Sequence, residues 1–124
     1  MEKLRQAALA VLDKAYSPYS GIRVAAAAEA ADGTVFTGVN IENASYGLTV
    51  CAERNAVFRA IGEGQRDLLR MAVVTDSPLV QSPCGACRQV LFECNPEMLI
   101  DFYGPEGFHR QFIARELLPD GFTL

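Results

Sequence analysis

The alternation of helix-like and strand-like segments in the second half of this chain restricts its fold more than any other feature. Residues 51–61 have a helical pattern, residues 71–75 are a β-branched run, residues 84–94 are again helical, and residues 98–103 are extended. A tight turn joins only antiparallel strands, so strands joined through a helix are expected to lie parallel in one sheet. The order therefore predicts a sheet with parallel segments and helices on both faces.

The first half of the chain adds a helix and a hairpin. Apolar residues recur at steps of three and four over residues 4–15, which predicts an amphipathic helix that ends before Pro18. Residues 24–31 and 34–41 have an extended pattern. They flank the pair Asp32-Gly33, which is typical of the turn of a β-hairpin because both residues tolerate positive φ.

The C-terminal part completes the expected fold. A last short strand is expected at residues 111–114 and one helical turn at residues 115–118. Gly62 follows the helical pattern of residues 51–61 and is expected to end that helix in the left-handed conformation. Together these elements predict an α/β fold, a three-layer α/β/α sandwich with a central mixed sheet of about five strands.

The length and charge of the chain exclude several classes of function. Its 124 residues match a single domain, 1–124, because domains of roughly 100–150 residues are the commonest size. The net charge is −4 and the basic residues are scattered, so nucleic acid is not expected as a partner. No apolar run reaches the roughly 18 residues of a membrane span, and charges interrupt the apolar residues of the N-terminus, so no signal peptide is expected either.

Four cysteines without a secretory signal indicate the cytoplasm, where thiols are more often metal ligands or catalytic groups than disulfides. Three of them lie in the motifs Cys51-Ala52-Glu53 and Cys84-x-x-Cys87, each where a helix is expected to begin. Helix N-termini lower the pKa of thiols and favour the thiolate that binds a metal. Three thiolates leave one position of a tetrahedral zinc ion open for water, and Glu53 would accept a proton from that water.

Plainer interpretations apply to parts of this pattern. A Cys-x-x-Cys pair alone is also typical of a thiol-redox motif or of half of a structural zinc site. Cys94 is expected about two turns along the helix from Cys87 and is interpreted as a core cysteine. His109, the only histidine, is far in the sequence from the cysteine motifs and is interpreted as a surface or packing residue.

Five segments form a more specific pattern when taken together: residues 15–20, 38–44, 51–54, 82–89 and 116–119. They include Cys-Ala-Glu-Arg and Pro-Cys-Gly-Ala-Cys-Arg-Gln, and in this order they resemble the short-chain members of the zinc-dependent cytidine deaminase family. The resemblance implies a homotetramer with sites at subunit interfaces and a nucleoside substrate. It also implies one zinc ion per subunit, held by Cys51, Cys84 and Cys87, with Glu53 as the proton shuttle.

The resemblance further implies roles for residues around the substrate. Asn40 and Glu42 match the pair that holds a ribose hydroxyl, and the Ala52 N–H would bond to the pyrimidine. Tyr46 and Phe122 match residues that reach into a neighbouring subunit's site. A polar strand end remains the alternative for Asn40 and Glu42, and ordinary packing remains the alternative for Tyr46 and Phe122.

Two positions bear on affinity and on charge. Ile22 stands where family members usually carry an aromatic residue that packs against the nucleoside. Isoleucine cannot supply the stacking contribution of about 0.5–1.5 kcal/mol that an aromatic residue would give.

A zinc ion with three thiolates carries net negative charge and is a weaker Lewis acid than one with three histidines. The guanidinium of Arg54 is expected to offset this charge by donating to ligand sulfurs, together with the two helix N-termini.

The expected function is hydrolytic deamination of cytidine and 2′-deoxycytidine to uridine and deoxyuridine, with release of ammonia, in pyrimidine salvage. The first alternative is deamination of a cytosine nucleoside antibiotic of the blasticidin type, because that group shares the Cys-Ala-Glu and Pro-Cys-Gly-x-Cys-Arg-Gln motifs. The intact Asn40-Ile41-Glu42 and Arg54 favour cytidine. A structural-zinc or thiol-redox module is the alternative from another class, and it predicts no role for Glu53.

Overall fold

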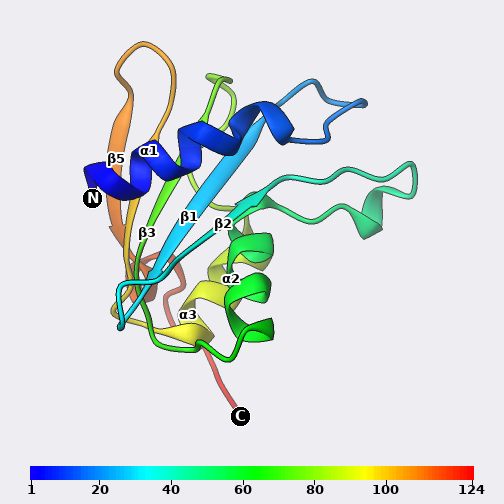
Figure 1. Ribbon diagram of the computed structural model, residues 1–124. Coiled ribbons are helices and arrows are strands. Elements are labelled where there is room, and N and C mark those ends of the chain that lie inside the picture. Colours follow the sequence, from blue (N-terminus) through cyan, green and yellow to red (C-terminus); the bar gives the residue numbers. More distant parts are fainter.

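The computed structural model describes residues 1–124 and is built on one sheet of five strands in the order β2-β1-β3-β4-β5 (Figure 1). The strands are β1 Val24–Ala30, β2 Val35–Val39, β3 Leu68–Thr75, β4 Leu99–Tyr103 and β5 His109–Ile113. The α-helices are α1 Glu2–Val11, α2 Ala52–Gly62, α3 Gly85–Cys94 and α4 Ala114–Leu117, and short 3-10 turns span Leu12–Lys14 and Tyr46–Leu48. No helix is both long enough and apolar enough to span a membrane.

The strand pairing makes the sheet mixed, as predicted. β3 and β4 are parallel, whereas the other three neighbouring pairs are antiparallel. The parallel pair needs a crossover connection, and α3 lies in that connection. The predicted hairpin is also confirmed: β1 and β2 flank Asp32 and Gly33, and Gly33 has a φ of 89°.

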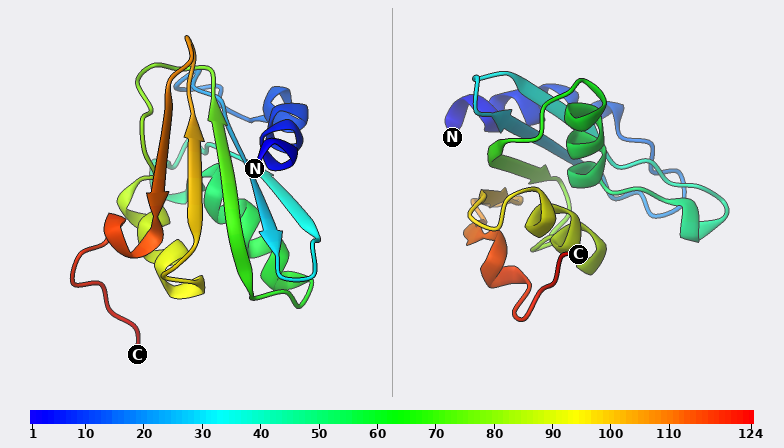
Figure 2. Two further views of the ribbon diagram at one scale, coloured as in Figure 1. Left: turned by 90° about the vertical axis from the view of Figure 1, so that its left-hand side faces the viewer. Right: turned by 90° about the horizontal axis from the view of Figure 1, so that it is seen from below.

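Helices cover both faces of the sheet, which confirms the predicted three-layer sandwich (Figure 2). α1 packs on β1, β2 and β3 on one face, and α2 and α3 lie side by side on the other. Successive residues of β1 point to opposite layers: Ala25 and Ala27 belong to the smaller core beside α1, whereas Ala26 and Ala28 belong to the larger core beside α2 and α3. The nearly continuous apolar sequence of β1 therefore reflects burial on both faces.

Gly62 does not end α2 in the left-handed conformation, contrary to the prediction. It is the last residue of α2, and Gly64, two residues later, has the positive φ of 88°. The N–H of Glu63 still bonds to the carbonyls of Arg59 and Ala60, so the helical turn continues past Gly62. Glycine adopts helical angles at a cost of about 1 kcal/mol, and the chain reverses at the second glycine instead.

β3 begins at Leu68, earlier than the predicted run of residues 71–75. Its added part includes Arg70, whose Nη2 lies 2.5 Å from Oε1 of Glu29 on the neighbouring β1. Such cross-strand ion pairs stabilise a sheet, but a charged residue interrupts the apolar pattern by which a buried strand is identified. The sequence pattern therefore did not predict that the strand starts at Leu68.

The contact between α2 and β2 determines where the first cysteine motif lies. A Cβ atom on Gly38 of β2 would lie 2.4 Å from Ala56 N and 2.6 Å from Ala52 O, both in the backbone of α2. Only glycine permits so close an approach. This close contact places the first turns of α2 directly on β2, near the end of the strand at Val39. Asn40 is the next residue.

Candidate functional site

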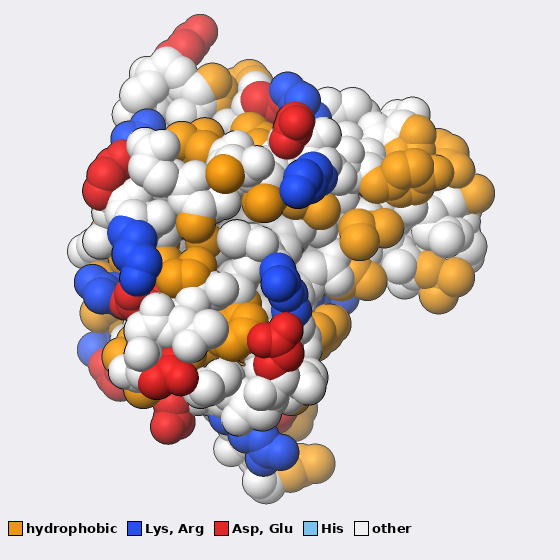
Figure 3. All heavy atoms as spheres, viewed as in Figure 1, with side chains coloured by type: hydrophobic (Ala, Val, Ile, Leu, Met, Phe, Trp, Pro, Cys, Tyr) orange, Lys and Arg blue, Asp and Glu red, His pale blue; other side chains and the backbone are white.

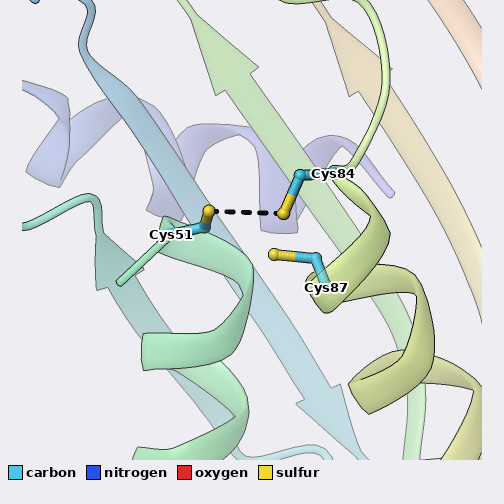
Figure 4. Close-up of side chains that lie close together, drawn as sticks. All are labelled: Cys51, Cys84 and Cys87. Carbon is cyan, nitrogen blue, oxygen red and sulfur yellow. Dashed lines mark hydrogen bonds between the residues drawn. The ribbon is translucent and has the colours of Figure 1, made fainter. Parts of the chain in front are cut away.

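Three cysteine thiols meet where α2 and α3 begin. Cys51 is the residue before α2, Cys84 is the residue before α3, and Cys87 lies in the first turn of α3. Their sulfurs point toward one another (Figure 4), with 3.6 Å between Cys51 Sγ and Cys84 Sγ and all three Sγ atoms within 4.8 Å of one another. None of the four cysteines of the chain forms a disulfide.

The spacing of the three sulfurs fits one zinc ion. Two sulfurs that each lie about 2.3 Å from a tetrahedral zinc ion are about 3.8 Å apart, close to the 3.6 Å between the Sγ atoms of Cys51 and Cys84. No fourth His, Cys, Asp or Glu belongs to the cluster. Cys94 is at the far end of α3 against the larger core, and His109 stacks on Tyr103 of β4. Three protein ligands leave one coordination position open, which is the pattern of catalytic zinc.

Hydrogen bonds among these groups favour a thiolate at Cys51. The pKa of Cys51 is lowered to about 5, chiefly by a hydrogen bond with the Cys87 thiol and further by Arg54 and Cys84. The same bond raises the pKa of Cys87, which keeps its proton as the donor. Nη2 of Arg54 lies 3.5 Å from Cys51 Sγ and donates to it. The cluster is thus electron-rich even without a metal and has a cation beside it.

Glu53 lies in the first turn of α2, next to the thiols, and is only 4% exposed. Burial raises the pKa of its carboxyl group to about 7, well above the ordinary value of 4.5. A carboxyl group with a pKa near neutrality can both accept and return a proton at physiological pH. The side chain faces a cavity of about 220 Å³, lined by Val24, Asn40, Thr49, Cys51, Ala52, Glu53, Val80, Ser82 and Cys84.

Asn40 and Glu42 line two adjacent cavities. Asn40 faces the same cavity as Glu53, and its side-chain amide bridges two backbone groups, accepting from Val24 N at 2.9 Å and donating to Ile22 O at 2.8 Å. Glu42 faces the neighbouring cavity of about 440 Å³, and Thr49 lines both. Thr49 is therefore common to the cavity that Asn40 lines and the cavity that Glu42 lines.

The Glu42 carboxylate is fixed by one short segment of chain. It accepts hydrogen bonds from Tyr19 N at 2.9 Å, from Ser20 N at 3.1 Å and from the Ser20 hydroxyl. These bonds lower the pKa of Glu42, so its carboxylate is ionised at neutral pH. Tyr46, in the 3-10 turn beside this cavity, is 75% exposed and meets Tyr19 edge to face, with 6.1 Å between ring centroids.

Two of the predicted substrate residues do not line these cavities within one chain. The side chain of Ile22 packs against the larger core, and its carbonyl accepts the bond from Asn40. Phe122 is 67% exposed in the C-terminal segment after α4, and its carbonyl accepts a hydrogen bond from Gln89 Nε2 at 3.1 Å. Within one chain Phe122 thus lies outside both core clusters, and its role at a neighbouring subunit's site stays a prediction.

Comparison with known proteins adds the decisive observation. The family model described as the cytidine and deoxycytidylate deaminase zinc-binding region matches residues 1–101. The chain belongs to the cytidine and deoxycytidylate deaminase family. Membership of this family makes zinc the metal cofactor, and the cluster of Cys51, Cys84 and Cys87 can hold one such ion.

Relatives within the family match nearly the whole chain. A cytidine deaminase from Halalkalibacterium halodurans is 46% identical over 123 residues, which cover 98% of this chain and 93% of the relative. The crystal structure of cytidine deaminase from Burkholderia pseudomallei has a TM-score of 0.92 at 44% identity and covers 98% of both chains. That of cytidine deaminase from Mycobacterium tuberculosis has a TM-score of 0.84 at 46% identity, covering 99% of this chain and 97% of the other.

Two residues that shape the site were given no role in the sequence analysis. Nδ2 of Asn55 donates to Val39 O at 2.7 Å and to Val50 O at 3.4 Å, and so joins the end of β2 to the residue before Cys51. Asparagine is a weak helix former, which was the only available signal one turn into α2. Arg88 bonds to three groups outside α3; it is part of the Pro-Cys-Gly-Ala-Cys-Arg-Gln motif, but the motif alone assigned it no role.

Proposed function

We propose that this protein catalyses the zinc-dependent hydrolytic deamination of cytidine, with water as the second reactant and uridine and ammonia as the products. The observation that carries the proposal is that the buried carboxyl group of Glu53 shares one cavity with two thiols of a three-thiol cluster. A structural-zinc or thiol-redox module would not require such a carboxyl group there. Membership of the deaminase family supports the same conclusion.

In this proposal Cys51, Cys84 and Cys87 hold the zinc ion. When bound, zinc acts as a Lewis acid that makes water nucleophilic at neutral pH. The Glu53 carboxylate takes a proton from the attacking water and passes it to N3 of the pyrimidine ring. A C4–O bond forms, and Glu53 then transfers the proton of the new C4 hydroxyl to the exocyclic amino group. The exocyclic C4–N bond breaks, the C4 carbonyl of uridine forms, and ammonia leaves. Arg54 would draw charge from the Cys51 sulfur, so that this thiolate donates less charge to the metal and leaves it a stronger Lewis acid.

The sugar and base would be held by residues that line the two cavities that have Thr49 in common. Asn40 still has one free amide N–H after bonding to Ile22, and Glu42 keeps acceptor capacity, so together they can satisfy a ribose hydroxyl. The Ala52 N–H would bond to the pyrimidine. None of these contacts requires a 2′-hydroxyl, so the proposal includes 2′-deoxycytidine. The side chain of Ile22 packs against the larger core, so it would support the site from behind without the stacking that an aromatic residue could give.

We further propose a homotetramer whose sites lie at subunit interfaces. Hydrophobic side chains gather on the arm that projects at the right of the molecule (Figure 3), formed by the segment between β2 and α2 (Figure 1). Its exposed apolar residues include Ile41, Tyr46 and Leu48. Such a patch is typical of protein–protein contacts. In the tetramer Tyr46 and Phe122 would reach a neighbour's cavity, and the enzyme would act in cytoplasmic pyrimidine salvage.

An ultraviolet assay with a panel of cytosine nucleosides tests the proposed function. Cytidine and 2′-deoxycytidine should lose absorbance on deamination, and a zinc chelator should stop the reaction until zinc is restored. A cytosine antibiotic of the blasticidin type and cytosine within single-stranded RNA or DNA are included as competing substrates. Turnover of the antibiotic alone, or zinc binding with no turnover of any nucleoside, would overturn the proposal.

The assembly has a separate test. Light scattering should give the mass of four chains, and Phe122→Ala should raise KM for cytidine more than it lowers kcat, because the ring would contact the bound base. Phe58→Ala is a matched control, since Phe58 is another exposed phenylalanine but lies on α2 outside both cavities. A monomer that turns over cytidine normally would contradict the tetramer.

A further inference from the structure

The zinc ligand Cys84 follows a long irregular connection. Residues 76–83, between β3 and Cys84, form neither helix nor strand, and Cys84 is the most exposed of the three clustered cysteines. By contrast, Cys51 is preceded by Val50, which forms a bridge with Ile41 and accepts a bond from Asn55. An exposed thiol at the end of an irregular loop needs another restraint if it is to keep a fixed distance from Cys51.

The side chain of Arg88 supplies such a restraint. Its Nε donates to Pro83 O at 2.8 Å, and its Nη2 donates to Ser82 Oγ at 3.0 Å. Both acceptors belong to the two residues immediately before Cys84. The third nitrogen, Nη1, donates to Leu117 O at 3.3 Å. All three guanidinium nitrogens are therefore used, and none of these bonds goes to a sulfur atom.

The third bond connects the loop to a helix that packs against the rest of the molecule. Leu117 ends α4, which packs against α3 and β5, and both Ala114 and Leu117 of this helix are buried. Arg88 itself extends from α3, one turn after Cys84. The end of the loop is thus held between α3 and α4 by one planar group. A lysine ammonium at this position has a single nitrogen and cannot reproduce the three-way geometry.

We propose that Arg88 is a positioning residue for the metal site, which sets the distance of Cys84 Sγ from the other two thiols by fixing residues 82 and 83. The inference rests on the proposed function, because it assumes that Cys84 is a zinc ligand. Zinc binding requires ligand distances within about 0.2 Å of their ordinary values, so even a small loop displacement weakens it. Arg54 has a different role, since it contacts the Cys51 sulfur directly.

Zinc affinity of the full-length protein, measured by competition with a chromogenic chelator, tests this role. Arg88→Lys keeps the charge and should bind zinc about 10–100-fold more weakly than the wild-type protein, the usual effect of removing a group that orients a metal ligand. Ser82→Ala, which removes one acceptor, should weaken binding less. In the double variant Ser82→Ala should have little further effect, because both changes break the same contact.

Arg115→Lys is the matched control. Arg115 lies in α4 and, like Arg88, uses its guanidinium for hydrogen bonds. It pairs only with the exposed side chains of Glu97 and Glu116, so its variant should bind zinc like the wild type. Circular dichroism checks that each variant is folded. If Arg88→Lys does not fold, the Ser82→Ala variant tests the contact independently. A cobalt-substituted sample adds a spectroscopic readout: the thiolate charge-transfer absorption should weaken or shift in Arg88→Lys and not in Arg115→Lys.

Two results would overturn the inference. One is zinc affinity of Arg88→Lys within twofold of the wild type, and the other is full additivity of the Ser82 and Arg88 substitutions. Both differ from failure of the proposed function, which would appear as a wild-type protein that binds no zinc or binds it without deaminating cytidine.

Discussion

The sulfur atoms of Cys51 and Cys84 lie 3.6 Å apart although 33 residues separate them in the chain. Each cysteine stands at the start of a helix, and the two helices lie side by side on the same face of the sheet. The distance is too long for a disulfide, in which the sulfurs are about 2.05 Å apart, and is suited to two ligands of one ion. If both sulfurs bind one zinc ion, as proposed, stability and activity should depend on the metal.

Zinc removal should destabilise the protein. A ligand that binds only the folded state adds about 2.7 kcal/mol at a free concentration 100 times its Kd, so a chelator should lower Tm measurably. Cys84→Ser should lose most of its zinc and its Tm response to the chelator. Cys94→Ser is the control, because Cys94 lies outside the cluster and should keep one zinc ion per chain. Equal zinc content in both variants would argue against Cys84 as a ligand.

Glu53→Gln should abolish most of the activity without removing zinc. General acid–base catalysis contributes about 10²–10⁴-fold, so kcat for cytidine should fall within that range. Glu63→Gln changes an exposed glutamate just after the same helix and should leave kcat unchanged. Steady-state kinetics with metal analysis checks both, and near-normal turnover by Glu53→Gln would refute the proton-shuttle role.

Arg54→Gln should lower activity through the metal ligand that Arg54 contacts. Without the bond from Nη2 to Cys51 Sγ, the sulfur retains more charge and zinc becomes a weaker Lewis acid. We expect kcat to fall by about 10–100-fold. Arg59→Gln, an exposed change on the same helix, is the control. Unchanged zinc content and unchanged kcat in Arg54→Gln would show that no charge compensation is needed.

Gly38→Ala and Gly62→Ala should have opposite effects on stability. A Cβ at Gly38 would overlap the backbone of α2, which cannot yield easily, and we expect a loss of at least about 1–3 kcal/mol in the free energy of unfolding. Gly62 is helical with open space around its Cα, so alanine there should add up to about 1 kcal/mol. Urea denaturation measures both. A neutral Gly38→Ala would contradict the close packing of α2 on β2.

The pair of Glu29 and Arg70 should make stability depend on acid pH. The hydrogen bond from Arg70 holds the pKa of Glu29 below its ordinary value of 4.5, and the charge of Lys3 adds to this. The stabilisation is therefore fully present above the unfolded-state pKa and is lost as pH falls through the folded-state pKa. Glu29→Gln should cost less than about 1 kcal/mol at neutral pH, and this difference should disappear in acid. A difference that does not shrink as the pH of the urea titrations falls progressively below 4.5 would contradict the assignment.

The sequence by itself determined the elements and the chemistry they carry. Steps of three and four, the β-branched runs and the Asp32-Gly33 turn are local patterns, so they predicted the helices, the hairpin and the mixed sheet. The motifs around Cys51 and Cys84 also predicted thiols at helix starts. Local patterns were insufficient at Gly62, where a second glycine two residues later was equally able to adopt positive φ.

The tertiary structure alone decided how these parts meet. Strand order and the close contact at Gly38 place the two helix starts together, and they bring Glu53 and Asn40 to one cavity. The bonds of Arg88 to Pro83 and Leu117 likewise join segments that no local pattern connects. The physical reason is that such contacts depend on strand pairing and packing over long sequence separations, whereas periodicity and turn chemistry report only on neighbouring residues.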